Sequence, residues 1–179
     1  MDLKLIYGNM RALCEAPQMM LHYADIPYEY KMVWDHYGSS WAEVKKDIIF
    51  NRLPILIINE DKYLWQSNTI IRYLSNLTKT KPSDEFQLAY CDAVFESTHE
   101  MFAPLNPTIN MTFGEKYNSN KKKLLEDILP NSLNNFEKLL QNSSGNFFIG
   151  NDPFYCDFNA YHHFSMCLIL DKNIFSNFP

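Results

Sequence analysis

The alternation of apolar and polar positions predicts strands and helices in turn over the start of the chain. Leu3 to Tyr7 and Tyr28 to Val33 are short runs rich in apolar, aromatic and β-branched residues, as is typical of strands. From Leu13 to Tyr23, apolar residues recur at spacings of three and four, which indicates a helix. Pro17 fits the first turn of that helix, where a missing N–H has no partner in any case.

The next stretch adds two helices and two strands. Trp41 to Ile48 has one apolar face and predicts a short helix. Ile55 to Ile58 is a branched aliphatic run that predicts a buried strand, and a polar turn separates it from a second strand at Lys62 to Trp65. Residues 66–74 have helical spacing. The order β-α-β-α-β-β-α predicts an α/β unit with a mixed sheet.

The polar cluster Gln66-Ser67-Asn68 lies at the N-terminus of that last predicted helix. Free N–H groups and the helix macrodipole favour anions at such a position. The simpler interpretation is an ordinary serine cap. The residues alone leave both a structural cap and an anion-binding site open.

The rest of the chain predicts helices only. A polar segment, Thr78 to Asp84, is the expected linker between a domain at 1–77 and a second domain at 85–179. Within the second domain, one long helix is expected to end before Pro104, and another is expected to bend at Pro130. Residues 156–170 are so apolar that their helix should be buried.

Composition and charge exclude several classes of protein. Hydrophobic residues make up 46% of the 179 residues, which is ample for a packed core. The net charge is −5 and no basic patch is present, so we expect no nucleic-acid partner; Lys121 to Lys123 is expected to form a solvated helix start. Residues 2 to 7 are too short and too charged for a signal peptide or a membrane span. We therefore expect a cytoplasmic protein with no membrane partner.

The four cysteines show no Cys-x-x-Cys spacing. His162 and His163 lie about one helical turn from Cys167, which is only a weak indication of a metal site, and no metal is expected. Structural thiols in a reducing compartment are the better interpretation, and this holds for Cys14 as well.

Four motifs in family order resemble the cytosolic glutathione transferases, over nearly the whole chain. They are Leu5-Ile6-Tyr7 with Asn9-Met10-Arg11, Trp41-Ala42-Glu43-Val44-Lys45, Arg52-Leu53-Pro54-Ile55-Leu56, and Gln66-Ser67-Asn68 with Ile71-Arg72-Tyr73-Leu74. The chain is most similar to the sigma class, which includes the haematopoietic prostaglandin D synthases, and has some mu-like features. The resemblance implies a thioredoxin-like α/β N-terminal domain followed by an all-helical domain.

The resemblance also implies a binding site for glutathione as co-substrate. The Tyr7 hydroxyl would hydrogen-bond the glutathione sulfur and lower the pKa of its thiol, whereas packing at a strand end is the structural alternative. Pro54 is expected to be cis, with the Leu53 backbone pairing with the cysteinyl moiety. Gln66 and Ser67 would take the γ-glutamyl carboxylate.

The resemblance also implies roles in glutathione binding for residues elsewhere in the chain. Trp41 and Lys45 are suited to the glycyl carboxylate, with Arg52 assisting. Glu100 matches an acidic residue that reaches the glutathione amine of the neighbouring subunit in sigma dimers, which implies a homodimer. An ordinary solvated carboxylate is the alternative for Glu100.

The electrophile-binding side departs from the sigma pattern. The acceptor pocket would be formed by Gly8, Met10, Arg11, Leu13 and Phe102. Gly8 replaces an aromatic residue and would widen the pocket. Leu13 replaces an arginine that polarises the tyrosine, so activation of Tyr7 must come from elsewhere, either from Arg11 or from backbone N–H groups.

Two further departures concern the helical domain. Phe154 occupies the position of a Ser or Thr N-cap while Asp157 is retained, so half of a capping box is missing unless Asp152 caps instead. The sequence ends at Pro179, whereas the resemblance implies about one further helix; this fits either a naturally short protein or a truncated one, and the acceptor pocket is expected to be more open.

These observations predict a glutathione transferase that conjugates the glutathione thiolate to small hydrophobic electrophiles. The alternative is a transferase-derived binding or structural protein, comparable to lens crystallins, that has little or no turnover.

Overall fold

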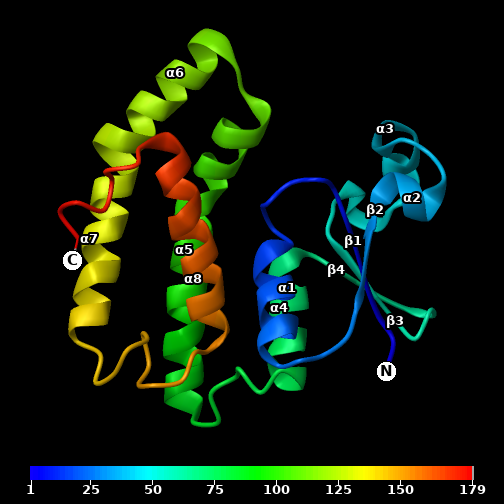
Figure 1. The fold of residues 1–179 in the computed structure, drawn as a ribbon, viewed down its shortest axis with the longest axis horizontal. Helices are drawn as coiled ribbons and strands as arrows, with labels where there is room; N and C mark the ends of the chain where they lie inside the picture. The colour runs from blue at the N-terminus through cyan, green and yellow to red at the C-terminus, as the bar shows by residue number, and fades with distance from the viewer. Residues whose placement is uncertain (179) are drawn as a thin grey trace. The chain divides into compact units, whose positions relative to one another are not determined.

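The computed structural model describes residues 1–178. The chain forms two compact units, Met1–Lys81 and Pro82–Pro179. Figure 1 shows that the first unit contains the sheet and that the second is helical. The predicted fold class, a thioredoxin-like α/β unit followed by an all-α unit, is confirmed. None of the helices within residues 1–178 has the length and apolar character needed to cross a bilayer.

The first unit is built on a four-stranded mixed sheet, as predicted. Its strands are β1 (Leu3–Tyr7), β2 (Glu29–Met32), β3 (Ile55–Ile58) and β4 (Lys62–Trp65). The strand order is β2-β1-β3-β4. β1 runs parallel to β2 and antiparallel to β3, and β3 runs antiparallel to β4.

Two longer helices and several short ones connect these strands. The longer ones, α1 (Glu15–Tyr23) and α4 (Ser67–Leu77), lie side by side against the sheet (Figure 1). α2 (Val33–Tyr37) was not predicted from the sequence. The helix expected at Trp41 to Ile48 is shorter: α3 (Trp41–Val44) changes to 3-10 geometry in η1 (Lys45–Asp47), and η2 (Ile49–Asn51) follows.

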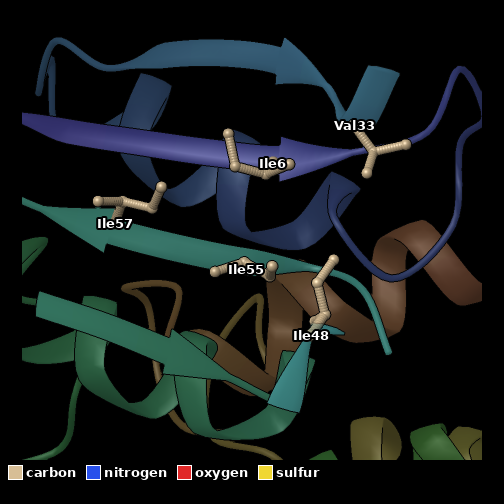
Figure 2. Packing of buried hydrophobic residues seen from close by; sticks show 5 residues of the cluster. All are labelled: Ile6, Val33, Ile48, Ile55 and Ile57. Atoms are coloured by element: carbon tan, nitrogen blue, oxygen red, sulfur yellow. The ribbon is translucent and has the colours of Figure 1, made fainter. Parts of the chain in front are cut away.

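Alternation along the strands gives the sheet two buried faces. Leu5 and Leu56 are opposite each other in the register, are fully buried and share one face. The other face carries a cluster of aliphatic side chains, shown in Figure 2: Ile6, Val33, Ile48, Ile55 and Ile57. Trp41, Val44, Leu53 and Trp65 pack against this cluster. The segment between β2 and β3 is thereby held against the sheet by apolar contacts.

The second unit begins with a helix that is longer than predicted. α5 (Glu85–Met111) continues through Pro104 and Pro107, so the expected end before Pro104 is wrong. Each proline removes one backbone N–H, but the two positions are three residues apart and lie on the same side of the helix. Leu105 and Thr108 are buried beside them, and packing of the helix outweighs the local preference to stop.

A nearly continuous helical segment follows. It consists of α6 (Gly114–Lys123), a π-helical turn η3 (Leu124–Ile128) and α7 (Leu129–Gln141). The lysine run forms the last turn of α6, where the chain continues helically into η3, so its prediction as a helix start is wrong. Pro130 lies in the first turn of α7. A bend was predicted at this proline, and the irregularity that the helix shows is the π-helical turn η3 directly before α7.

The last helix is buried, as predicted. α8 (Tyr155–Leu170) packs against α5 (Figure 1). Tyr155 lies edge-on to Phe95, and His163 stacks on Phe102 with 3.9 Å between ring centroids. The Ser or Thr half of the capping box is missing, as expected, but Asp157 accepts a backbone N–H with each of its two carboxylate oxygens. Oδ2 accepts from Phe154 at 2.9 Å and Oδ1 accepts from Phe148 at 3.0 Å.

Candidate active site

The strand register brings three of the predicted site residues to one edge of the sheet. Ile6 pairs with Ile55, and Ile55 pairs with Trp65. Both strand pairs are antiparallel, so the residue after Ile6, the residue before Ile55 and the residue after Trp65 lie at the same end of the sheet. These residues are Tyr7, Pro54 and Gln66. Adjacent strands lie about 4.8 Å apart, so this row spans about 10 Å.

Tyr7 is the last residue of β1, and its side chain is only 6% exposed. Its hydroxyl oxygen accepts a hydrogen bond from the backbone N–H of Leu13 at 3.3 Å. Burial raises the pKa of Tyr7 to about 12, although the Leu13 contact acts in the opposite direction. The hydroxyl is therefore protonated at neutral pH. Because its oxygen accepts from Leu13, its proton is available to a further acceptor.

The loop after β1 is held at both ends. At its start, the Tyr30 hydroxyl donates to the Gly8 carbonyl oxygen at 2.8 Å. At its end, Arg11 Nε lies 2.9 Å from Glu15 Oε1 in an ion pair, and the Arg11 side chain is 55% exposed. Arg11 and a backbone N–H were the two groups expected to polarise Tyr7, and the structure shows the backbone N–H of Leu13 in contact with the Tyr7 hydroxyl. Met10 on the same loop is exposed.

Leu53 and Pro54 precede β3. The Leu53–Pro54 peptide bond is cis, which confirms that prediction. Pro54 is buried and Leu53 packs against the aliphatic cluster of Figure 2. Arg52, just before them, is exposed.

Gln66 and Ser67 form the start of α4. Gln66 has φ 70° and ψ 118°, a positive-φ conformation that is uncommon for a residue other than glycine. Such a conformation costs on the order of 1 kcal/mol and persists where the surrounding structure enforces it, often at functional sites. Ser67 is 7% exposed and occupies the first turn, where backbone N–H groups have no helical partner.

Trp41 and Lys45 follow a capping box formed by Ser40 and Glu43, a feature absent from the predictions above. Oε2 of Glu43 accepts from the Ser40 hydroxyl at 2.7 Å and from the Ser40 backbone N–H at 3.1 Å. The hydrogen bond from the Ser39 hydroxyl, followed by those from Ser40, lowers the pKa of Glu43 to about 2. The signal was present in the sequence as Ser-x-x-Glu before an apolar position. Trp41 is half-buried and Lys45 is exposed.

Two predicted residues lie in the second unit. Glu100 is exposed on α5. Phe102 is fully buried on the same helix, and the rings of His162 and His163 contact it. Phe102 is therefore part of the core of this unit.

The histidine and cysteine positions form no metal centre among residues 1–178, since no group of three or more His, Cys, Asp or Glu side chains there is arranged to hold a metal ion. The Cys167 thiol donates to the His163 carbonyl oxygen at 3.5 Å. All four cysteines are buried and free, and burial raises the pKa of the Cys14 thiol. These are properties of structural rather than reactive thiols.

Comparison with known proteins defines the class. Residues 1–76 match the model for the glutathione S-transferase N-terminal domain, and residues 99–179 match a model for the C-terminal domain. The chain is 27% identical to glutathione S-transferase P of Caenorhabditis elegans, over 100% of this chain and 83% of that protein. It is 30% identical to a glutathione S-transferase of Plasmodium yoelii yoelii, over 79% of this chain and 67% of that protein.

A solved structure of rat hPGDS complexed with a quinoline has the same fold. Its TM-score is 0.87 at 25% identity, over 100% of this chain and 86% of that one. The two units, the mixed sheet and the matched domains together define a protein of the thioredoxin-like, two-unit architecture. The chain belongs to the glutathione S-transferase family.

Proposed function

We propose that this protein binds glutathione along the sheet edge formed by Tyr7, Pro54 and Gln66 and transfers its thiolate to small hydrophobic electrophiles. The observation that carries the proposal is the Tyr7 hydroxyl at this edge, buried, protonated and accepting the Leu13 N–H. A hydroxyl in this state donates its proton to an anionic sulfur better than to a neutral one, and so favours the thiolate.

The dimensions of the edge support a tripeptide ligand. Three extended residues span about 10 Å, which is also the width of the row from β1 to β4. The cysteinyl backbone would pair with Leu53 in the manner of an added strand. The γ-glutamyl carboxylate would lie at the N-terminus of α4 beside Gln66 and Ser67, where free N–H groups and the macrodipole favour an anion.

The glycyl carboxylate would lie at the exposed cations of the segment before β3. Lys45 and Arg52 are both exposed, and the capping box at Ser40 fixes the start of the helix that carries Trp41. A flexible exposed lysine contributes a point charge, whereas the indole N–H of Trp41 contributes a directed donor.

The chemical step is a substitution or addition by sulfur. With a chlorodinitrobenzene, a carbon–sulfur bond forms, the carbon–chlorine bond breaks, and chloride leaves with the bonding electrons. The thiol proton passes to solvent when the thiolate forms. The electrophile would contact the loop after β1, at Gly8, Met10, Arg11 and Leu13. These residues define no specific partner for the electrophile, so a broad range of apolar substrates is expected.

We also propose a homodimer acting in the cytoplasm, with Glu100 directed to the glutathione of the partner. Exposed apolar side chains on the first unit support an interface. Ile49 and Phe50 are 52% and 60% exposed, and the ring of Phe50 lies edge-on to that of Trp65. Free buried thiols agree with a reducing compartment.

A single preparation tests the function. We expect the purified protein to be retained on immobilised glutathione and to conjugate chlorodinitrobenzene, and we expect Tyr7→Phe to slow the reaction by about tenfold or more, since a hydrogen bond to a charged group contributes about 1.5–3 kcal/mol. Retention without turnover would indicate a binding protein derived from a transferase. A protein that is not retained would overturn the assignment of the edge.

A further inference from the structure

The structure contains a hydrogen bond from β2 to the loop that follows Tyr7. Tyr30 pairs with Leu5 in the parallel register of β1 and β2. Alternation along β1 puts Leu5 and Tyr7 on the same face of the sheet, and Tyr30 shares this face. The hydroxyl of Tyr30 reaches past the end of β1 and donates to the carbonyl oxygen of Gly8 at 2.8 Å.

The hydrogen bond from Tyr30 to Gly8 affects Tyr7 through the conformation of the loop after β1. The loop leaves β1 at Gly8 and returns so that the Leu13 N–H reaches the Tyr7 hydroxyl at 3.3 Å. That distance is already longer than the usual 2.9–3.0 Å or so for an N–H···O bond, so a shift of a few tenths of an ångström would abolish it. The Gly8 carbonyl is fixed by Tyr30, and the far end of the loop is fixed by the Arg11–Glu15 ion pair.

We propose that Tyr30 is a positioning residue for the thiolate, which it stabilises indirectly by holding the loop so that the Leu13 N–H polarises the Tyr7 hydroxyl. This inference rests on the proposed function of Tyr7 as hydrogen-bond donor to glutathione sulfur. A hydroxyl whose oxygen accepts an N–H is a stronger donor, because hydrogen bonds in series polarise one another. Loss of the Tyr30 bond therefore weakens the Tyr7 donor without removing it.

The hydroxyl of Tyr30 is suited to this role at all physiological pH values. It is half-buried, and burial together with the nearby Cys14 and Tyr7 raises its pKa. It therefore remains a neutral donor to Gly8.

Tyr28 offers a matched control on the same segment. It too is half-buried, but its hydroxyl contacts α1, with Gln18 Oε1 at 3.3 Å and His22 Nε2 at 3.0 Å. Tyr28→Phe and Tyr30→Phe remove the same atom two residues apart. Only Tyr30→Phe removes a hydrogen bond to the loop after β1.

The experiment compares Tyr7→Phe, Tyr28→Phe and Tyr30→Phe in the full chain. The pKa of bound glutathione is measured from thiolate absorbance near 240 nm and from the pH profile of kcat with chlorodinitrobenzene. We expect Tyr30→Phe to raise that pKa by about half a unit to one unit, and to lower kcat at pH 6.5 by about three- to tenfold with KM for glutathione changed less than twofold. The difference in kcat between Tyr30→Phe and the wild type should disappear at high pH, where bound glutathione is ionised in both proteins. Tyr28→Phe should match the wild type.

The outcomes separate the two proposals. An unshifted pKa in Tyr30→Phe beside a raised pKa in Tyr7→Phe overturns the role of Tyr30 and leaves that of Tyr7 intact. An unshifted pKa in Tyr7→Phe overturns both. A loss of glutathione affinity in Tyr30→Phe with no change of pKa shows a structural role and also overturns the inference. Amide exchange of Leu13, faster in Tyr30→Phe than in Tyr28→Phe, provides a second readout that does not require turnover.

Discussion

The backbone N–H of Leu13 points at the hydroxyl oxygen of Tyr7, 3.3 Å away. Leu13, at the position where the resemblance to sigma-class enzymes implies an arginine, thus contacts Tyr7 through its main chain. A main-chain donor carries no charge, so its effect on Tyr7 is smaller than that of a guanidinium and depends on the path of the loop. This contact is the one through which the proposed role of Tyr7 would operate in a chain that lacks the arginine.

The pH dependence of the reaction follows from this arrangement. Burial raises the pKa of Tyr7 to about 12, so the hydroxyl stays a donor throughout the range in which a thiol titrates. We expect the rate to rise with pH as the bound thiol ionises, and Tyr7→Phe to move that rise upward by about one unit or more, since removal of the donor destabilises the thiolate. Rates of the two proteins should converge above the higher pKa. Parallel profiles, displaced by the same factor at every pH, would contradict the thiolate role.

The serine at the start of α4 should control affinity rather than chemistry. Ser67→Ala removes a donor from the proposed γ-glutamyl carboxylate site, and a hydrogen bond to a charged group contributes about 1.5–3 kcal/mol, which predicts an increase of about tenfold or more in the Kd for glutathione. We expect kcat at saturation to change little. The measurement is calorimetric titration with glutathione.

Ser75→Ala on the same helix is the matched control for this prediction. Ser75 is buried like Ser67, but its hydroxyl donates to the Arg72 carbonyl within the helix at 2.8 Å. Its removal should leave the Kd for glutathione unchanged. Equal Kd values for the two variants would exclude a specific role of Ser67.

The sequence was sufficient to predict the strands, because their signals are local. Leu3–Tyr7 and Ile55–Ile58 have the predicted bounds, since each is a short apolar run bordered by polar or turn residues. α5 was mispredicted because Pro104 is a strong local signal against a helix, and the packing that outweighs it joins residues far apart in sequence. The π turn before Pro130 has no sequence signature of its own.

The same distinction applies to the candidate site. Tyr7, Pro54 and Gln66 could be placed together from strand order and resemblance, because register follows once the strands are known. The contacts from Leu13 to Tyr7 and from Tyr30 to Gly8 involve main-chain atoms, whose directions depend on the loop conformation. A leucine or a glycine in a sequence gives no indication of where its N–H or carbonyl will point.

The stability of the second unit should depend strongly on Asp157. Its two oxygens accept the N–H groups of Phe148 and Phe154, and Phe148 is buried. Asp157→Ala leaves both donors without this partner, at a cost of about 1–3 kcal/mol for each buried group, and we expect a loss of about 3 kcal/mol in the free energy of unfolding by urea. Asp152→Ala should cost less than about 0.5 kcal/mol, as for an exposed residue. A loss of about 1 kcal/mol or more in Asp152→Ala would instead show that Asp152 caps α8.

His163 occupies a polar position in the core between α5 and α8. Its Nδ1 lies 3.1 Å from the Thr98 carbonyl oxygen, which can only accept, so Nδ1 carries the proton. The Asn159 amide donates instead to the Thr98 hydroxyl at 2.8 Å. The neutral imidazole is therefore fixed in one tautomer. Burial, together with the neighbouring His162 and His99, lowers the pKa of His163 well below 6.5.

This lowered pKa predicts acid sensitivity of a definite sign. Above pH 6.5 the imidazole is neutral in both the folded and the unfolded chain, so its titration costs no stability. As the pH falls below this value, the unfolded chain takes up the proton and the folded chain does not, and stability falls by about 1.4 kcal/mol per pH unit until the folded pKa is reached. His163→Gln retains a donor for Thr98 and removes this titration, while His162 and His99 remain in both proteins. In urea unfolding at pH values from about 7.5 to 5.5, the wild type should lose stability more steeply than the variant by that amount. If the two proteins lose stability in parallel, His163 is protonated in the folded state as readily as in the unfolded one, and the buried neutral imidazole is refuted.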